Sequence, residues 1–504
     1  MNPYLDQLAF LAPELTLIAL ALVILVWDLL KKGRDSRHLG YATVAGMALI
    51  AWMLLGQWNS LGETGRHTET VLGMVVIDRF GTFFKLFTVG SLAVVALFVI
   101  YDKRERKHGI GEYFFLLSGA AIGIFFMVST NNLLLLMLGL ELLSLASYSL
   151  AGFHKGDRRS AEAALKYIVF GGLSAGVMLY GISLLYGLTG TIDLNAMGTG
   201  AQGLAAQFQT SPVPVAVAVV LVLAGFAYKV SVVPFHFWTP DVYQGAPTPV
   251  TTFLAVASKA AGFAVLLRFI GALFMVEGVQ DTVVAYSERI GLLLAILAAV
   301  TMTLGNLSAL RQTNLKRMLA YSSIAHAGYV LIGLAAMTTQ GFSAAVFYLA
   351  AYYFMNLGAF GVLLYFEGVN GSEEVDDLNG LGWKCPVVSI AMVVFLVSLT
   401  GIPPTIGFNG KLALFYAGVD SGLTWLVVIA GLNSAISLFY YFRIVKALFL
   451  TEAESKTGTG EPALGGIIAA LSAATVLTSL LFSDKLQGWS DAGSQSLGIQ
   501  DQAK

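Results

Sequence analysis

Long apolar runs, each separated from the next by a short polar segment, recur along almost the whole chain. Each run has at least about 18 residues, enough for a helix to cross a hydrocarbon core of ~30 Å. The pattern therefore predicts an all-α polytopic membrane protein with about fourteen transmembrane helices. The predicted spans are 11–30, 38–58, 78–100, 111–129, 131–151, 160–187, 213–237, 247–275, 287–310, 315–337, 341–366, 386–418, 422–450 and 463–483.

Basic residues gather in the loops that follow predicted spans one, three, five and nine. They are Lys31, Lys32, Arg34, Arg37, Lys103, Arg104, Arg106, Lys107, Lys155, Arg158, Arg159, Arg311, Lys316 and Arg317. The opposite loops carry few, such as Arg66 and Arg289. Because short basic loops are retained in the cytoplasm, both termini are expected on the outer side.

Two further segments interrupt the spans. The linker 189–214 is expected on the outer side, in part at the membrane interface. The acidic segment 367–380 is expected to be a cytoplasmic loop, either solvated because of its like charges or serving as a docking site for a basic partner.

Composition excludes several classes of protein. Hydrophobic residues make up 57% of the chain and charged residues 12%, far from the balance of a soluble domain. With a net charge of −1 there is no basic surface for nucleic acid. The single cysteine, Cys385, excludes an intramolecular disulfide and a four-cysteine zinc or iron–sulfur site. We therefore expect no cofactor and no metal in this chain.

Two predicted spans carry breaks that correspond. Span seven has Lys229 followed by Pro234, and span twelve has the segment 401–407 followed by Lys411. Proline leaves backbone carbonyls that protein or water must satisfy inside a membrane. Matched broken helices indicate an ion site between inverted repeats. We expect one integral membrane domain, 1–504, with three N-terminal helices (1–110), inverted five-helix repeats from spans 4–8 (111–275) and 9–13 (286–450), and a last helix with its tail (451–504).

Four ionisable residues lie deep in predicted spans: Glu141, Lys229, Lys259 and Lys411. A charge at mid-membrane costs about 3 kcal/mol or more, so such residues usually have a function. Lysine can exchange a proton reversibly when burial brings its pKa near the working pH. The set indicates a proton path. The alternatives are a structural hydrogen bond for Glu141 and snorkelling for the lysines.

Other candidates are less central. Lys166 lies nearer the end of its span and could belong to the path or snorkel. His236 and His326 could pass protons through either ring nitrogen or could join helices by hydrogen bonds. Lys85 and Arg268 are expected to be interfacial anchors.

Three ordered motifs identify a family resemblance. They are VPFHFWTPDVYQGAPTPVTTFLAVASK at 233–259, QTNLKRMLAYSSIAHAGY at 312–329 and SLTGIPPTIGFNGKLALF at 398–415. With them, the full length of the chain resembles the antiporter-like subunit N family of respiratory NADH:quinone oxidoreductase (complex I, NDH-1). The segment DVYQGAPTPVT, the lysine at 411 and the short C-terminus favour this family over the related subunits L and M.

The resemblance implies a fold, a function and a set of site residues. The fold is a fourteen-span inverted repeat that moves protons when quinone reduction elsewhere drives it. The family's relay residues fall on Glu141, Lys229, Lys259 and Lys411, with Lys166, His236 and His326 as accessory members. No cofactor is implied here, whereas FMN and iron–sulfur clusters are expected in partner subunits. The partners implied are the other membrane-arm subunits, including antiporter-like ones, together with lipid, protons and water, in a bacterial plasma (inner) membrane.

Two alternatives remain open at this point. The same ionisable set would suit a subunit of a multisubunit sodium/proton antiporter or a related membrane hydrogenase. The buried charges could also only lock helices together in a membrane-arm scaffold.

Overall fold

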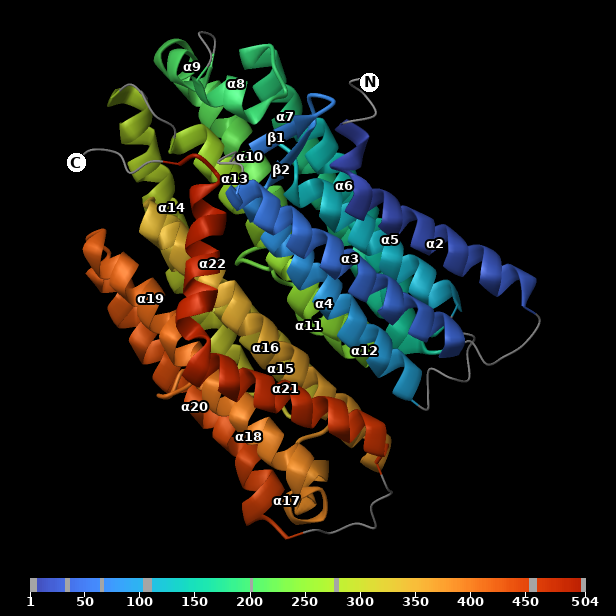
Figure 1. Ribbon diagram of the computed structural model, residues 1–504. Helices are drawn as coiled ribbons and strands as arrows, with labels where there is room; N and C mark the ends of the chain where they lie inside the picture. The colour runs from blue at the N-terminus through green and yellow to red at the C-terminus, as the bar shows by residue number, and fades with distance from the viewer. Residues whose placement is uncertain are drawn as a thin grey trace.

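The computed structural model describes residues 7–31, 37–63, 68–102, 111–199, 203–275, 281–452 and 460–499. Nearly all of them are helical, and the long helices run side by side through the molecule (Figure 1). The long helices are α2 (Ala12–Leu30), α3 (Arg37–Glu63), α4 (Arg79–Tyr101), α5 (Gly111–Val128), α6 (Leu133–Ala151), α7 (Arg158–Thr189), α10 (Pro212–Lys229), α13 (Lys259–Phe274), α14 (Asp281–Leu310), α15 (Leu315–Ala335), α16 (Thr339–Asn370), α18 (Pro386–Thr400), α19 (Ile406–Asp420), α20 (Thr424–Leu450) and α21 (Pro462–Leu481). The shorter ones are α8 (Leu194–Thr199), α9 (Leu204–Thr210), α11 (Trp238–Gly245), α12 (Thr248–Phe253), α17 (Leu381–Lys384) and α22 (Ser483–Gln495).

The predicted fold class is confirmed. Thirteen helices in the described residues are long and apolar enough to cross a membrane, or fourteen if the bent segment 376–400 counts as one span. The chain is therefore an all-α polytopic membrane protein.

Both predicted breaks are present. Span seven ends as a continuous helix at Lys229, and α11 resumes at Trp238. In span twelve, α18 ends at Thr400 and α19 begins at Ile406. Each break contains a cis prolyl peptide, at Val233–Pro234 and at Pro403–Pro404. The inverted-repeat relationship and the domain boundaries remain predictions.

Three small features were not predicted: a hairpin, the helices within the linker 189–214, and a helix after the last span. Strands β1 (Thr68–Val71) and β2 (Val75–Asp78) form an antiparallel hairpin. Helices α8 and α9 occupy the linker that was expected to be a loop. The third element, α22, follows the last span and packs against α16 and α4. The hairpin, α8 and α9 lie at one end of the molecule, where α2 begins and α22 ends, while α17 lies at the opposite end (Figure 1).

The prediction that Lys85 and Arg268 are interfacial anchors is wrong. Lys85 is completely buried, and its Nζ lies 2.5 Å from Oε1 of Glu14 in α2. Arg268 is 3% exposed and forms an ion pair with Asp78, the N-cap of α4, at 2.8 Å. Each cation thus joins helices inside the protein.

The acidic segment and its basic neighbour also differ from expectation. Glu367 lies inside α16 and is buried, and Lys316 at the start of α15 is buried beside it, with 3.5 Å between Nζ and Oε1. Lys316 also pairs with Glu373 at 2.9 Å. The segment therefore packs against α15 instead of remaining fully solvated. Most basic residues of the first two predicted cytoplasmic loops lie outside the described residues.

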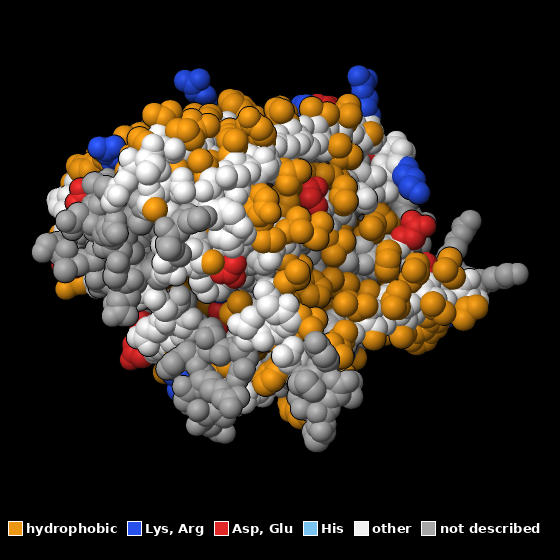
Figure 2. Space-filling model, turned by 90° about the horizontal axis from the view of Figure 1, so that it is seen from above, with side chains coloured by type: hydrophobic (Ala, Val, Ile, Leu, Met, Phe, Trp, Pro, Cys, Tyr) orange, Lys and Arg blue, Asp and Glu red, His pale blue; other side chains and the backbone are white. Residues whose placement is uncertain are grey.

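The outer surface suits a lipid environment. Large apolar side chains are exposed on the outer helices, for example Leu30 at 78%, Trp52 at 72% and Phe439 at 70%. Figure 2 shows hydrophobic side chains spread over much of one face, with few charged ones among them. Since water would oppose such exposure, these faces are expected to contact lipid or neighbouring subunits.

Candidate functional site

Four predicted site residues are buried inside the helix bundle. Lys229, Lys259, His326 and Lys411 are each at most 3% exposed. Charged side chains are almost never fully buried unless they have polar partners. The partners of each residue therefore decide what the site can do.

The first partner group lies between α6 and α10. Lys229, the last residue of α10, donates from Nζ to the Ser144 hydroxyl at 3.2 Å. Glu141, one turn before Ser144, is partly buried, and its Oε1 has no hydrogen-bond partner among the described residues. Glu141 and Lys229 do not form a direct ion pair, but Lys229 is hydrogen-bonded to the residue one turn after Glu141 on the same helix. The serine thus holds the lysine beside the carboxylate.

The break after Lys229 is satisfied by protein groups. The Tyr228 carbonyl accepts a hydrogen bond from the Trp238 indole nitrogen at 3.0 Å, and the Val233 amide donates to Thr301 Oγ1 at 3.1 Å. Irregular backbone is tolerated at membrane depth when protein supplies such partners. The chain can therefore end a helix at a buried lysine.

Lys259 lies at the start of α13, directly after a π-helical turn, Leu254–Ser258. Its Nζ donates to the Ser323 carbonyl oxygen at 2.9 Å and also contacts the Ser323 hydroxyl. The Tyr352 hydroxyl donates to that same Ser323 oxygen at 2.8 Å. Single π-turns within helices are frequent at functional sites, and this one presents the lysine to α15 and α16.

His326 lies at the centre of a tyrosine cluster. Its Nδ1 is 2.5 Å from the Tyr348 hydroxyl, and its Nε2 is 3.3 Å from the Tyr441 hydroxyl. Tyr441 in turn lies 2.5 Å from the Ser322 hydroxyl. Both ring nitrogens therefore face groups that can donate or accept a proton.

Lys411 occupies the break in span twelve. Its Nζ donates to the Thr400 carbonyl, the last of α18, at 2.9 Å and to the Ser434 hydroxyl at 3.0 Å. The ammonium also lies over the Tyr329 ring, 4.4 Å from its centroid, and Tyr329 lies 3.1 Å from Ser434. A lysine placed here satisfies a carbonyl that the broken helix leaves free.

These groups form one axis with short gaps. Gly262 lies within one turn of Lys259 on α13, and the aliphatic part of the Lys229 side chain packs against it. A Cβ added at Gly262 would lie 3.1 Å from Lys229 Cγ. The rings of His326 and Tyr352 are 5.2 Å apart, and those of His326 and Tyr329 are 5.7 Å apart. Hydrogen bonds and ring contacts thus run from the Lys259 side to the Lys411 side, whereas packing alone joins Lys229 to α13.

Lys166 is not part of this axis. It is more than a third exposed and pairs with Asp241 at 2.5 Å and Glu162 at 2.7 Å. Arg317 pairs with the other Asp241 oxygen at 2.6 Å, so one carboxylate in α11 joins α7 to α15. Burial alone would raise the pKa of Asp241, but hydrogen bonds from Lys166 and Arg317 hold it below its ordinary value.

His236 lies in the break after Lys229 and is 5% exposed. Its Nδ1 has no hydrogen-bond partner among the described residues, and its ring lies 4.4 Å from that of Phe237. No lysine of the axis forms a hydrogen bond with it in the described part of the chain. Its accessory role stays a prediction.

Sequence reasoning placed Ser322 and Ser323 beside His326 but missed the tyrosine hydroxyls that join them. Tyr348 and Tyr352 lie one turn apart in α16, and Ser322 and Ser323 lie beside His326 in α15. The spacing of the two tyrosines within an apolar run is a signal for one polar helix face. It is weak because tyrosine is common in membrane helices. The described residues contain no cluster of three histidine, cysteine or acidic side chains that could hold a metal ion.

Comparison with known proteins identifies the family of this chain. A family model described as NADH:quinone oxidoreductase/Mrp antiporter, TM matches residues 130–437. NADH-quinone oxidoreductase subunit N 2 of Sorangium cellulosum is 43% identical over 492 residues, which is 94% of each chain. The chain belongs to the NADH-quinone oxidoreductase subunit N family. The resemblance expected from the sequence is therefore confirmed.

Solved structures agree with this family. A chain of respiratory complex I from Thermus thermophilus is 32% identical, with a TM-score of 0.77, and the match covers 94% of this chain and 98% of that one. A chain of the Mrp complex from Dietzia has a TM-score of 0.82 and covers 99% and 98% of the two chains, but it is only 21% identical. The second likeness concerns the fold alone.

Proposed function

We propose that this subunit N family member translocates protons as a membrane-arm subunit of NADH:quinone oxidoreductase. The observation that carries the proposal is that Lys229, Lys259, His326 and Lys411 are all buried and all hydrogen-bonded to a side-chain hydroxyl. A hydroxyl both donates and accepts, so it can pass a proton between neighbours. A scaffold would need only fixed ion pairs.

Proton loading takes place at Lys229, and Glu141 controls it. The carboxylate favours the charged lysine through space, and Ser144 holds the ammonium in position. At an effective dielectric of about 20, separating such a pair from about 4 to 8 Å weakens its attraction by roughly 2 kcal/mol. A small helix movement is therefore enough to release the proton toward Lys259.

Beyond Lys259 the proton follows the hydroxyl groups. Ser323 and Tyr352 carry it to His326, and the tyrosines around His326 carry it toward Lys411. Lys411 releases it to the outer side. Lys166 has an accessory role outside the axis through its ion pair with Asp241. His236 has an accessory role in proton transfer at the break after Lys229.

The assembly follows from the same proposal. The partners are the other membrane-arm subunits, including antiporter-like ones, in a bacterial inner membrane with both termini outward. FMN and iron–sulfur clusters belong to partner subunits, and quinone reduction there drives this chain. The subunit itself performs no redox chemistry.

The experiment compares proton pumping with quinone reduction in the assembled complex. Glu141→Gln and Lys411→Gln remove one charge each and keep similar volumes. Both are expected to lower the number of protons pumped per quinone reduced. Normal pumping in both variants, with the complex fully assembled, would rule out the relay. A scaffold predicts instead lower stability with an unchanged ratio.

A sodium/proton antiporter subunit is the second candidate, favoured by the fold shared with the Mrp chain. The 43% identity to a subunit N makes it the weaker one. Sodium-dependent proton exchange by membranes without NADH dehydrogenase activity would support it.

A further inference from the structure

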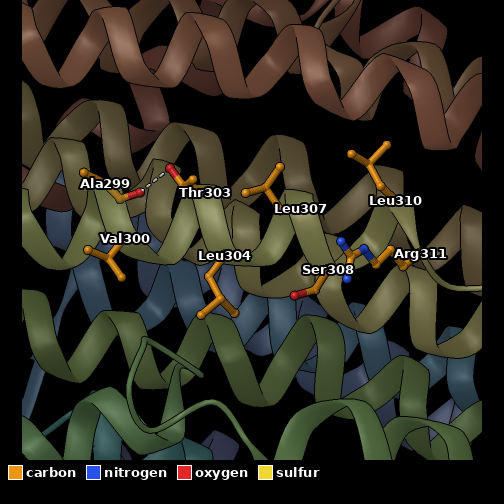
Figure 3. A pocket seen from close by; sticks show the side chains of 8 residues that line it. All are labelled: Ala299, Val300, Thr303, Leu304, Leu307, Ser308, Leu310 and Arg311. Carbon is orange, nitrogen blue, oxygen red and sulfur yellow. Dashed lines mark hydrogen bonds between the residues drawn. The ribbon is translucent and has the colours of Figure 1, made fainter.

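A groove of about 780 Å³ runs along α14 on the outside of the bundle. Its lining is mostly apolar and ends at Arg311 (Figure 3). Ala299, Thr303, Leu307 and Leu310 follow one edge of the helix, and Val300, Leu304, Ser308 and Arg311 follow the other. The groove matters because Thr303, on the edge facing α20, begins a buried polar connection to the relay.

The connection is made by two asparagines. Asn433 of α20 donates from Nδ2 to Thr303 Oγ1 at 3.1 Å, and its Oδ1 accepts from Asn306 Nδ2 at 3.1 Å. The Tyr440 hydroxyl donates to Asn306 Oδ1 at 3.0 Å. Asn306 and Asn433 are 0% and 3% exposed. Every polar atom of the pair has a partner, so the link is fully satisfied.

The inner end of this link reaches the relay. The Tyr440 ring lies 4.4 Å from that of Tyr441, centroid to centroid and tilted by 56°, and Tyr441 contacts His326. Asn433 is also the sequence neighbour of Ser434, which accepts a hydrogen bond from Lys411. Three side chains, Asn433, Asn306 and Tyr440, thus lie between Thr303 on the groove and Tyr441, which contacts His326.

We propose that Asn306 and Asn433 form a proton seal between the α14 groove and the relay. An amide accepts and donates hydrogen bonds but neither gains nor loses a proton near neutral pH. The pair therefore fills a polar gap without conducting. Water that enters the groove from its end at Arg311, expected on the cytoplasmic side, and takes the place of the amides would pass protons to Lys411 and short-circuit the pump. This inference rests on the proposed relay.

The test uses the whole complex in proteoliposomes. Asn306→Ala/Asn433→Ala removes both amides and leaves a space with polar walls, which holds water once it exceeds roughly 15 Å³. An imposed pH gradient should then collapse several-fold faster without NADH, while quinone reduction continues. Adding Lys411→Gln should remove most of the extra leak. Ser308→Ala, at a groove position whose side chain takes no part in the asparagine link, should stay as tight as the unaltered complex.

A second, milder double variant keeps the test decisive if the double alanine variant fails to assemble. Asn306→Ser/Asn433→Ser keeps hydrogen-bonding groups but replaces amides with hydroxyls that pass protons, so it should also leak. Membranes as tight as the unaltered complex with either assembled double variant would overturn the seal. That result would leave the relay intact if Lys411→Gln alone still lowers pumping. Unchanged pumping in Lys411→Gln would instead contradict the relay.

Discussion

Lys411 donates a hydrogen bond from Nζ to the carbonyl oxygen of Thr400 at 2.9 Å, across the break that separates α18 from α19. The proposed proton carrier is thus also the group that completes the broken helix. Loss or gain of a proton at Lys411 therefore changes how this carbonyl is satisfied. Coupling between proton transfer and helix position follows from that shared contact.

Gly401 controls the position of Lys411. It has φ +85°, and a Cβ there would lie 2.8 Å from Lys411 Cδ. Gly401→Ala should therefore displace the lysine and lower the protons pumped per quinone reduced, although no charge is lost. Gly422→Ala is the matched control, because Gly422 has φ +79° with nothing within 4 Å. Both variants carry a backbone cost of about 1 kcal/mol or more. Equal pumping in the two would show that the position of Lys411 is unimportant.

Tyr352 tests the hydroxyl path between Lys259 and His326. Tyr352→Phe removes the hydroxyl that donates to Ser323 and keeps the ring. A lost hydrogen bond of about 1.4 kcal/mol in the transfer step slows it roughly tenfold. Pumping-coupled turnover should fall, whereas Tyr180→Phe, at a position 61% exposed, should not change it. Turnover and pumping at normal levels in Tyr352→Phe would exclude this tyrosine from the path.

The ion pairs of Asp241 should make the stability of the folded protein depend on pH. Because Lys166 and Arg317 lower its folded pKa, its contribution is present above the unfolded carboxyl pKa of about 4 and is lost as the pH falls through the folded value. The stability difference between the unaltered complex and Asp241→Asn should be constant near neutral pH and shrink in acid. Thermal unfolding at several pH values measures it. A difference that grew on acidification would contradict the ion-pair arrangement.

Breaking the buried ion pair between Arg268 and Asp78 should lower the stability of the protein strongly. Arg268→Met leaves the Asp78 carboxylate unpaired in the interior, which costs about 3–5 kcal/mol. Adding Asp78→Asn should recover part of that loss, since asparagine is neutral and still caps α4. The exposed Arg289→Met is the control. Equal melting temperatures of the complex with Arg268→Met and with Arg289→Met would refute the prediction.

Sequence reasoning could locate the breaks and their lysines because a charge or a proline within an apolar run is costly in a membrane. Lys229 and Lys411 stand out for that reason. Tyr352 and Ser323 do not, because neutral hydroxyls are cheap anywhere in a helix, and only packing decides which of them meet.

Ion-pair partners were the other limit. The sequence pattern favours anchors at Lys85 and Arg268 because their partners, Glu14 and Asp78, lie 71 and 190 positions away. Glu367 and Lys316, 51 positions apart by number, were assigned to cytoplasmic loops for the same reason. Long-range pairing of helices cannot be read from the charge pattern of one chain.

The most direct test is the ratio of protons pumped to quinone reduced in the assembled complex that carries Lys229→Met. Methionine keeps most of the volume of the side chain and removes its charge. The proton-relay account predicts a lower ratio at unchanged content of the complex. A ratio and a turnover equal to those of the unaltered complex would contradict it.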